Sequence, residues 1–144
     1  MALFPFFQKY SKEELEIIQF IFLRFGYKPK SLVHFHRALT HKSVAAEDTD
    51  TNERLEFLGD AILDSVVAEF LYRKFPTEDE GYLTKIKSKI VNRRTLGDIG
   101  HEMELSNIMN YNNSRSIKLE TIEGNAFEAL IGAIYLDGGY HKAQ

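Results

Sequence analysis

Apolar residues recur at intervals of three and four along most of the chain, and strict alternation of apolar and polar residues is absent. This spacing is typical of amphipathic helices and predicts six of them, near residues 12–25, 31–39, 52–74, 79–93, 94–103 and 121–136. Ser11, with acids in the turn that follows, predicts a helix N-cap, and Pro76 and Gly81 separate the third segment from the fourth. The pattern therefore predicts an all-α fold.

Length and composition restrict the class of protein. With 144 residues and 44% hydrophobic content, the chain can form one domain with its own core. Cysteine is absent, which excludes disulfides and thiolate metal sites, and we expect a cytoplasmic protein. No segment predicts a membrane span, and the apolar cluster at residues 3–7 lacks the basic start and the length of a signal peptide. We expect that cluster to pack on the domain or on a neighbour.

Three acids share one face of the segment 52–74. Glu53, Glu56 and Asp60 fall within roughly 60° of one another on a helical wheel. Like charges so placed repel one another unless a cation lies between them, and Mg²⁺ prefers carboxylate oxygens as ligands. The arrangement therefore predicts part of a magnesium site, with a solvated acidic face as the alternative.

A second pair of oxygen-bearing side chains lies in the segment 121–136. Asn125 and Glu128 are one helical turn apart, and the residues around them are apolar at helical spacing, which indicates a buried helix. Buried oxygens of this kind need partners. If the two helices pack side by side, four ligands are predicted to surround one divalent cation: Glu56, Asp60, Asn125 and Glu128.

Basic residues are concentrated in one region. A formal net charge of −3 argues against general attraction to nucleic acid, so any contact with RNA must come from a local group of cations. On a single helix over 79–93, Lys85, Lys89 and Arg93 would lie within about 80° of one another. We interpret them as candidates for RNA phosphate binding, and an ordinary solvated helix face remains the alternative. No aromatic residues interleave with them, which suits duplex RNA.

Four stretches of the chain together resemble one known family. They are ALTHKS at 38–43, NERLEFLGDAILD at 52–64, EGYLTKIKSKIV at 80–91 and GNAFEALIGAIYLDGGY at 124–140. In this order they resemble the motifs of ribonuclease III of the bacterial type, the endonuclease that cuts double-stranded RNA. The second stretch is the most specific of the four.

The resemblance implies a fold, an activity and roles for individual residues. It implies the all-α ribonuclease III endonuclease fold and Mg²⁺-dependent hydrolysis of double-stranded RNA, with Mn²⁺ as a possible substitute, in processing of RNA such as rRNA. It also implies a homodimer that leaves staggered 3′ overhangs, with Phe57 inserted into a pocket of the second subunit. Glu56, Asp60 and Glu128 match catalytic, metal-binding carboxylates of the family. Glu53 and Glu80 match acids that support the site.

Asn125 departs from the family pattern, which most often has aspartate there. An amide oxygen still suits a hard cation, but one negative charge is lost, and we hypothesise weaker metal binding.

The position of the last residue indicates which part of a ribonuclease III this chain resembles. Because the sequence stops at Gln144, we expect a nuclease domain over residues 1–144 that lacks the family's final helix and any C-terminal double-stranded-RNA-binding domain. Two alternatives stay open: a catalytically silent ribonuclease III-like module that binds RNA or ribosomes, and an all-helical metal-dependent hydrolase of nucleotides.

Overall fold

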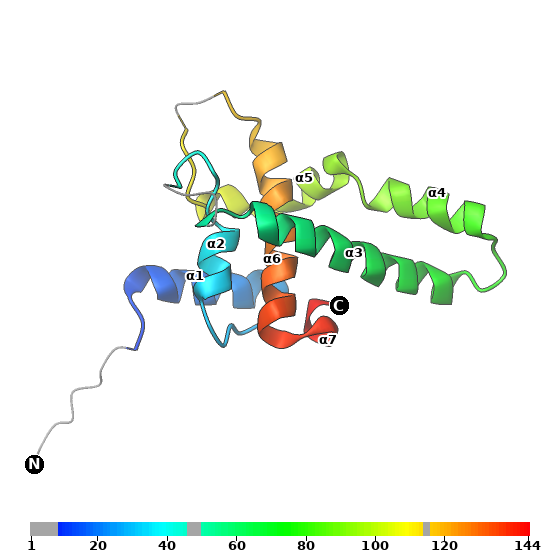
Figure 1. Ribbon diagram of the computed structural model, residues 1–144, viewed down its shortest axis with the longest axis horizontal. Helices are drawn as coiled ribbons and strands as arrows, with labels where there is room; N and C mark the ends of the chain where they lie inside the picture. Colours follow the sequence, from blue (N-terminus) through cyan, green and yellow to red (C-terminus); the bar gives the residue numbers. More distant parts are fainter. Residues whose placement is uncertain (1–8, 46–49, 114–115) are drawn as a thin grey trace, which may run out of the picture.

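The computed structural model describes residues 9–45, 50–113 and 116–144, and it is helical almost throughout (Figure 1). Within these ranges there is no β-strand, and one isolated parallel bridge joins Thr40 to Asn110. The all-α prediction is confirmed. The expectation for residues 3–7 lies outside the described residues. The elements are α1 (Lys12–Phe25), α2 (Val33–Ala38), α3 (Glu53–Lys74), α4 (Glu80–Ile90), α5 (Arg93–Glu102), the 3₁₀ helix η2 (Leu105–Asn107), α6 (Leu119–Gly138) and α7 (Tyr140–Ala143).

Helix α6 is the centre of the fold. It packs most extensively on α3 and α5, and also contacts α2, η2 and α7 (Figure 1). Because neighbours surround it, more than half of its residues are buried, including Ala126, Leu130 and Ala133, each fully inaccessible to solvent. A helix that is apolar on nearly all sides is stable only in such a position.

Glycines bring α3 and α6 into direct backbone contact. A Cβ atom on Gly59 would lie 1.7 Å from the main-chain oxygen of Glu128, and one on Gly132 would lie 2.6 Å from the main-chain oxygen of Leu55. Any larger side chain at either position would force the helices apart. The predicted ligands on α3 and α6 are therefore carried by two helices at their closest possible approach.

A buried carboxylate connects α6 to the segment that follows α5. Glu123 is fully buried and accepts hydrogen bonds from the main-chain N–H of Ser106 at 3.1 Å and from Nδ1 of His101 at 2.9 Å. The hydrogen bond to Glu123, and then its charge, raise the pKa of His101. These contacts hold α5 and η2 in register with α6.

Helices α3 and α4 form a hairpin that projects from the rest of the molecule (Figure 1). An ion pair of 3.0 Å between Lys87 and Asp64 and an edge-on contact between Phe75 and Tyr82 hold the two helices together. No residue of α4 is buried. Its outward side chains are therefore available to a partner.

The predicted helix over residues 79–93 is wrong at its C-terminal end. Helix α4 stops at Ile90, and α5 begins at Arg93. The cause is Asn92, whose side-chain oxygen accepts from the main-chain N–H of Thr95 at 3.0 Å while its amide nitrogen donates to the main-chain oxygen of Lys89 at 2.9 Å. One asparagine therefore ends the first helix and caps the second.

Other helix boundaries agree within a few residues. The helix predicted over 31–39 is shorter in the structure, the one over 121–136 is longer at both ends, and η2 and α7 were not predicted. No helix within the described ranges combines the length and the apolar character needed to cross a bilayer.

Candidate metal-binding and nuclease site

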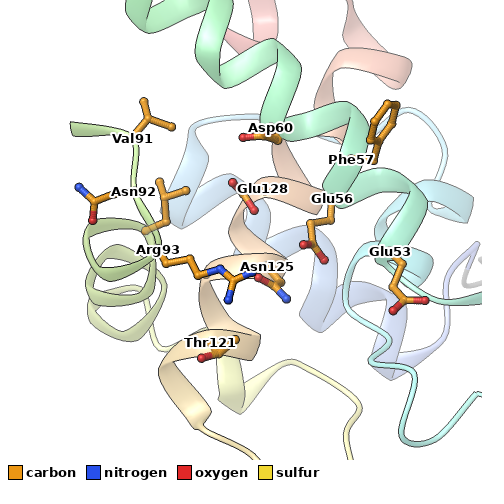
Figure 2. A pocket seen from close by; sticks show the side chains of 12 residues that line it. Glu53, Glu56, Phe57, Asp60, Val91, Asn92, Arg93, Thr121, Asn125 and Glu128 are labelled. Carbon is orange, nitrogen blue, oxygen red and sulfur yellow. The ribbon is translucent and has the colours of Figure 1, made fainter. Parts of the chain in front are cut away.

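The predicted ligands of α3 and α6 line one pocket of about 470 Å³ (Figure 2). We call this the acid pocket, and its lining includes all four predicted ligands: Glu56, Asp60, Asn125 and Glu128. The N-terminus of α5 closes another side, through Asn92 and Arg93. The four residues thus line one pocket, while their roles in metal binding and catalysis stay predictions.

Asp60 and Glu128 meet across the contact between α3 and α6. In Figure 2 their carboxylates face one another, and they are close enough to share a proton through a hydrogen bond. Burial, followed by the negative charges of Asp60 and Glu56, raises the pKa of Glu128 to about 7.

Glu56 lies on the same side of α3, half-buried, one turn before Asp60. Burial is the largest cause that raises its pKa, and the charges of Glu53 and Asp60 add to it. Arg93 and Lys42 act in the opposite direction. The net effect is a raised pKa, so the positive charges of Arg93 and Lys42 do not fully offset the negative charges around Glu56.

The donor atoms are of the kind that a hard divalent cation binds, namely three carboxylates and one amide oxygen. These side chains do not yet form a complete metal site. Among the described residues, no three His, Cys, Asp or Glu side chains are close enough to bind one ion jointly. Asp60 and Glu128 are in contact, while Glu56 lines the same pocket at a greater distance. The residues fit Mg²⁺ in the type of their donor atoms.

The two supporting acids differ in position. Glu53 lines the rim of the acid pocket and forms an ion pair of 2.9 Å with Lys42. Glu80 does not line that pocket within one subunit. It is the first residue of α4, about 15 Å of helix away from the end near the pocket, and it accepts a hydrogen bond from Thr84 at 2.7 Å.

The prediction that Arg93 shares a helix face with Lys85 and Lys89 is wrong. Both lysines are exposed on α4, whereas Arg93 begins α5 and lines the acid pocket. The break at Asn92 separates them. A capping asparagine followed three residues later by threonine was the available signal, but the surrounding helical pattern obscured it.

Phe57 points away from the acid pocket's acids and is 82% exposed. Phe57 itself lines one edge of a hollow of about 690 Å³, whose other apolar lining residues are Leu55, Leu58 and Leu136. A phenyl group this exposed next to an apolar hollow is unusual on a surface that faces only water.

Residues 32–144, which include all the pocket residues, match the family model described as Ribonuclease-III-like. The chain belongs to the ribonuclease-III-like family. Among curated relatives, it is 49% identical over 119 residues to Ribonuclease 3 of Zunongwangia profunda, covering 80% of this chain and 49% of that protein. It is 44% identical over 128 residues to Ribonuclease 3 of Bdellovibrio bacteriovorus, covering 84% of this chain and 55% of that protein. The chain thus spans about half the length of these relatives.

Solved structures agree with the family and the fold. The ribonuclease III nuclease domain of Campylobacter jejuni superimposes with a TM-score of 0.80 at 36% identity, covering 88% of this chain and 90% of that one. Dicer from Pichia stipitis superimposes with a TM-score of 0.60 at 29% identity, covering 79% of this chain and 49% of that one. The predicted ribonuclease III endonuclease fold is confirmed.

Proposed function

We propose that this chain is the nuclease domain of a metal-dependent endoribonuclease that hydrolyses phosphodiester bonds of double-stranded RNA in RNA processing. The observation that carries the proposal is the acid pocket, in which oxygen ligands from α3 and α6 converge. The relatives named Ribonuclease 3 support the same activity.

In this proposal Glu56, Asp60, Asn125 and Glu128 hold Mg²⁺, or Mn²⁺ in its place. When bound by these residues, the ion would supply a water-derived nucleophile and charge neutralisation at the scissile phosphate. Binding of a cation would favour the ionised form of Glu128, because a carboxylate ligand must be deprotonated. Helices α3 and α6 are in backbone contact at Gly59. This contact holds Asp60 and Glu128 close to each other in the acid pocket.

Surfaces on α4 and around the pocket complete the proposed RNA site. Lys85 and Lys89 are exposed on the projecting hairpin and would bind backbone phosphates of the duplex. Glu53 supports the site from its rim. Glu80 lies too far from the acid pocket to act in it within one subunit, so any role requires RNA or a second copy to bridge the distance.

A homodimer accounts for the exposure of Phe57. In a symmetric pair, each Phe57 would enter the apolar hollow of the other copy, so that one contact is made twice. The structure of the Campylobacter jejuni nuclease domain is described as having a region involved in dimer formation, which supports this arrangement. Two acid pockets related by a twofold axis would cut both strands of one duplex and leave staggered 3′ overhangs.

One assay tests the proposal against its alternatives. The chain is incubated with a long RNA duplex, with single-stranded RNA and with nucleoside triphosphates, first with Mg²⁺ and then with EDTA. We expect cleavage of the duplex that stops in EDTA and is lost in Asp60→Asn. Binding of the duplex without cleavage would point to a silent module, and hydrolysis of triphosphates alone would point to a nucleotide hydrolase. Either result would overturn the proposal.

A further inference from the structure

Arg93 has a fixed place at the edge of the acid pocket. The residue before it, Asn92, is extended (φ −150°, ψ 160°) and is hydrogen-bonded both to the end of α4 and to the first turn of α5. Arg93 follows as the first residue of α5 and lines the acid pocket. In Figure 2 its side chain extends from α5 toward Asn125 on α6.

The charge of Arg93 acts on the acids without being neutralised by one of them. Arg93 lines the acid pocket together with Glu56, Asp60 and Glu128. Within residues 9–45, 50–113 and 116–144, however, no carboxylate oxygen lies within 4.0 Å of the Arg93 guanidinium nitrogens. Arg93 therefore lines the same pocket as the acids without an ion pair to any of them among the described residues.

An Arg93 guanidinium that lines the pocket without a carboxylate partner among the described residues suits an anionic ligand. A guanidinium that served only as a counter-ion would be expected to pair directly with a carboxylate, because a direct pair is the stronger interaction. Its planar set of N–H donors also matches the oxygens of a phosphate group. A phosphate in the pocket would be attracted by Arg93 on one wall and by an acid-held cation on the other.

We propose that Arg93 binds a non-bridging oxygen of the phosphodiester group that is cut in the acid pocket. This inference rests on the proposed nuclease function and goes beyond it, since the role differs from that of Lys85 and Lys89. The lysines lie on α4 outside the pocket and contribute to duplex affinity. Arg93 acts where charge develops on the reacting phosphate, so its effect falls on the rate of cleavage.

The test compares Arg93→Gln, Arg93→Lys and the matched control Arg94→Gln. Arg94, like Arg93, is exposed, but it does not line the pocket. Single-turnover cleavage of a synthetic RNA duplex is measured with Mg²⁺, and duplex affinity is measured separately in EDTA. We expect Arg93→Gln to slow cleavage about 100-fold, as loss of a donor to a developing oxyanion does. We expect duplex affinity to change by less than about threefold, since one phosphate contact among many is lost.

Two further readouts separate this role from a structural one. Arg93→Lys, which keeps the charge but loses the planar fork, should recover part of the cleavage rate. Calorimetric titration of Mg²⁺ into the RNA-free protein should show that Arg93→Gln binds the ion at least as well as the wild type. Arg94→Gln should behave as the wild type in every measurement.

Several results would overturn the inference. One is an Arg93→Gln variant that cleaves as fast as the wild type, and another is a loss of duplex affinity as large as the loss of rate. Tighter Mg²⁺ binding together with faster cleavage at low Mg²⁺ would assign Arg93 the role of a competing counter-ion instead. If the wild-type chain cleaves no duplex, the proposed nuclease function is wrong. If the wild type cleaves and Arg93→Gln is equally active, only the inference about Arg93 is wrong.

Discussion

Replacing Glu128 with glutamine should stabilise the metal-free protein at alkaline pH while abolishing cleavage. The carboxylate is held against Asp60 and near Glu56, and its pKa rises from 4.5 to about 7. A group whose pKa is raised in the folded state stabilises the fold fully below its unfolded value, and this contribution is lost as the pH rises through the folded value. The stability of the wild type should therefore fall between pH 4.5 and about pH 8.

The size of the effect follows from the shift in pKa. About 2.5 units at 1.36 kcal/mol per unit gives an upper limit of about 3 kcal/mol. Glu128 is half-buried, so solvent screens part of the repulsion, and we expect about 1–2 kcal/mol. For a chain of this length, that corresponds to an increase of about 3–7 °C in Tm for Glu128→Gln over the wild type.

Thermal unfolding in EDTA at pH 5 and pH 8 measures this difference. We expect the variant and the wild type to be close at pH 5 and to separate at pH 8, with the variant more stable. Glu102→Gln is the matched control, because Glu102 is an exposed acid on α5 outside the acid pocket, and it should show no such separation. Saturating Mg²⁺ should stabilise the wild type more than Glu128→Gln.

Equal pH dependence of Tm for the wild type and Glu128→Gln would refute the reasoning. It would mean that the carboxylates of α3 and α6 are not crowded in solution. The central geometric argument for the metal site would then be lost.

Three other changes test separate features. Gly132→Ala should destabilise the fold by about 2–4 kcal/mol in urea denaturation, because its Cβ would lie 2.6 Å from a main-chain oxygen of α3; Gly81→Ala, whose nearest atom is 3.4 Å away, is the control and should be neutral or slightly stabilising. Phe57→Asp should yield monomers in sedimentation, and an intact dimer would place the interface elsewhere. Asn125→Asp should lower the Mg²⁺ concentration needed for half-maximal cleavage, since it restores a negative charge to the acid pocket; an unchanged titration would contradict the idea that the amide weakens metal binding.

Local patterns were sufficient to predict most of the helices. Ser11 and Glu14 form the capping box that begins α1, as the acids in its first turn indicated. The apolar positions of α6 predicted a buried helix because they repeat on more than one face. The end of α4 was mispredicted, since one extended residue at Asn92 interrupts an otherwise continuous helical pattern.

The sequence predicted which ligand residues lie together on one helix, but not how the two helices meet. Spacing within α3 and within α6 placed Glu56 with Asp60 and Asn125 with Glu128, but their meeting depends on tertiary packing at Gly59. A glycine in a helical segment gives no indication of which partner approaches it. The position of Arg93 was missed for a similar reason, because it depends on the chain reversal between α4 and α5.

The glycine contact between α3 and α6 also limits how this pocket could be re-engineered for another ion. A larger cation cannot be accommodated by moving the helices apart, because Gly59 and Gly132 have no side chains that could fill the widened gap. Ion preference must instead be altered through side-chain conformation and through the amide at Asn125. The spacing between the two helices is therefore fixed, and redesign has to change the side chains that line the pocket between them.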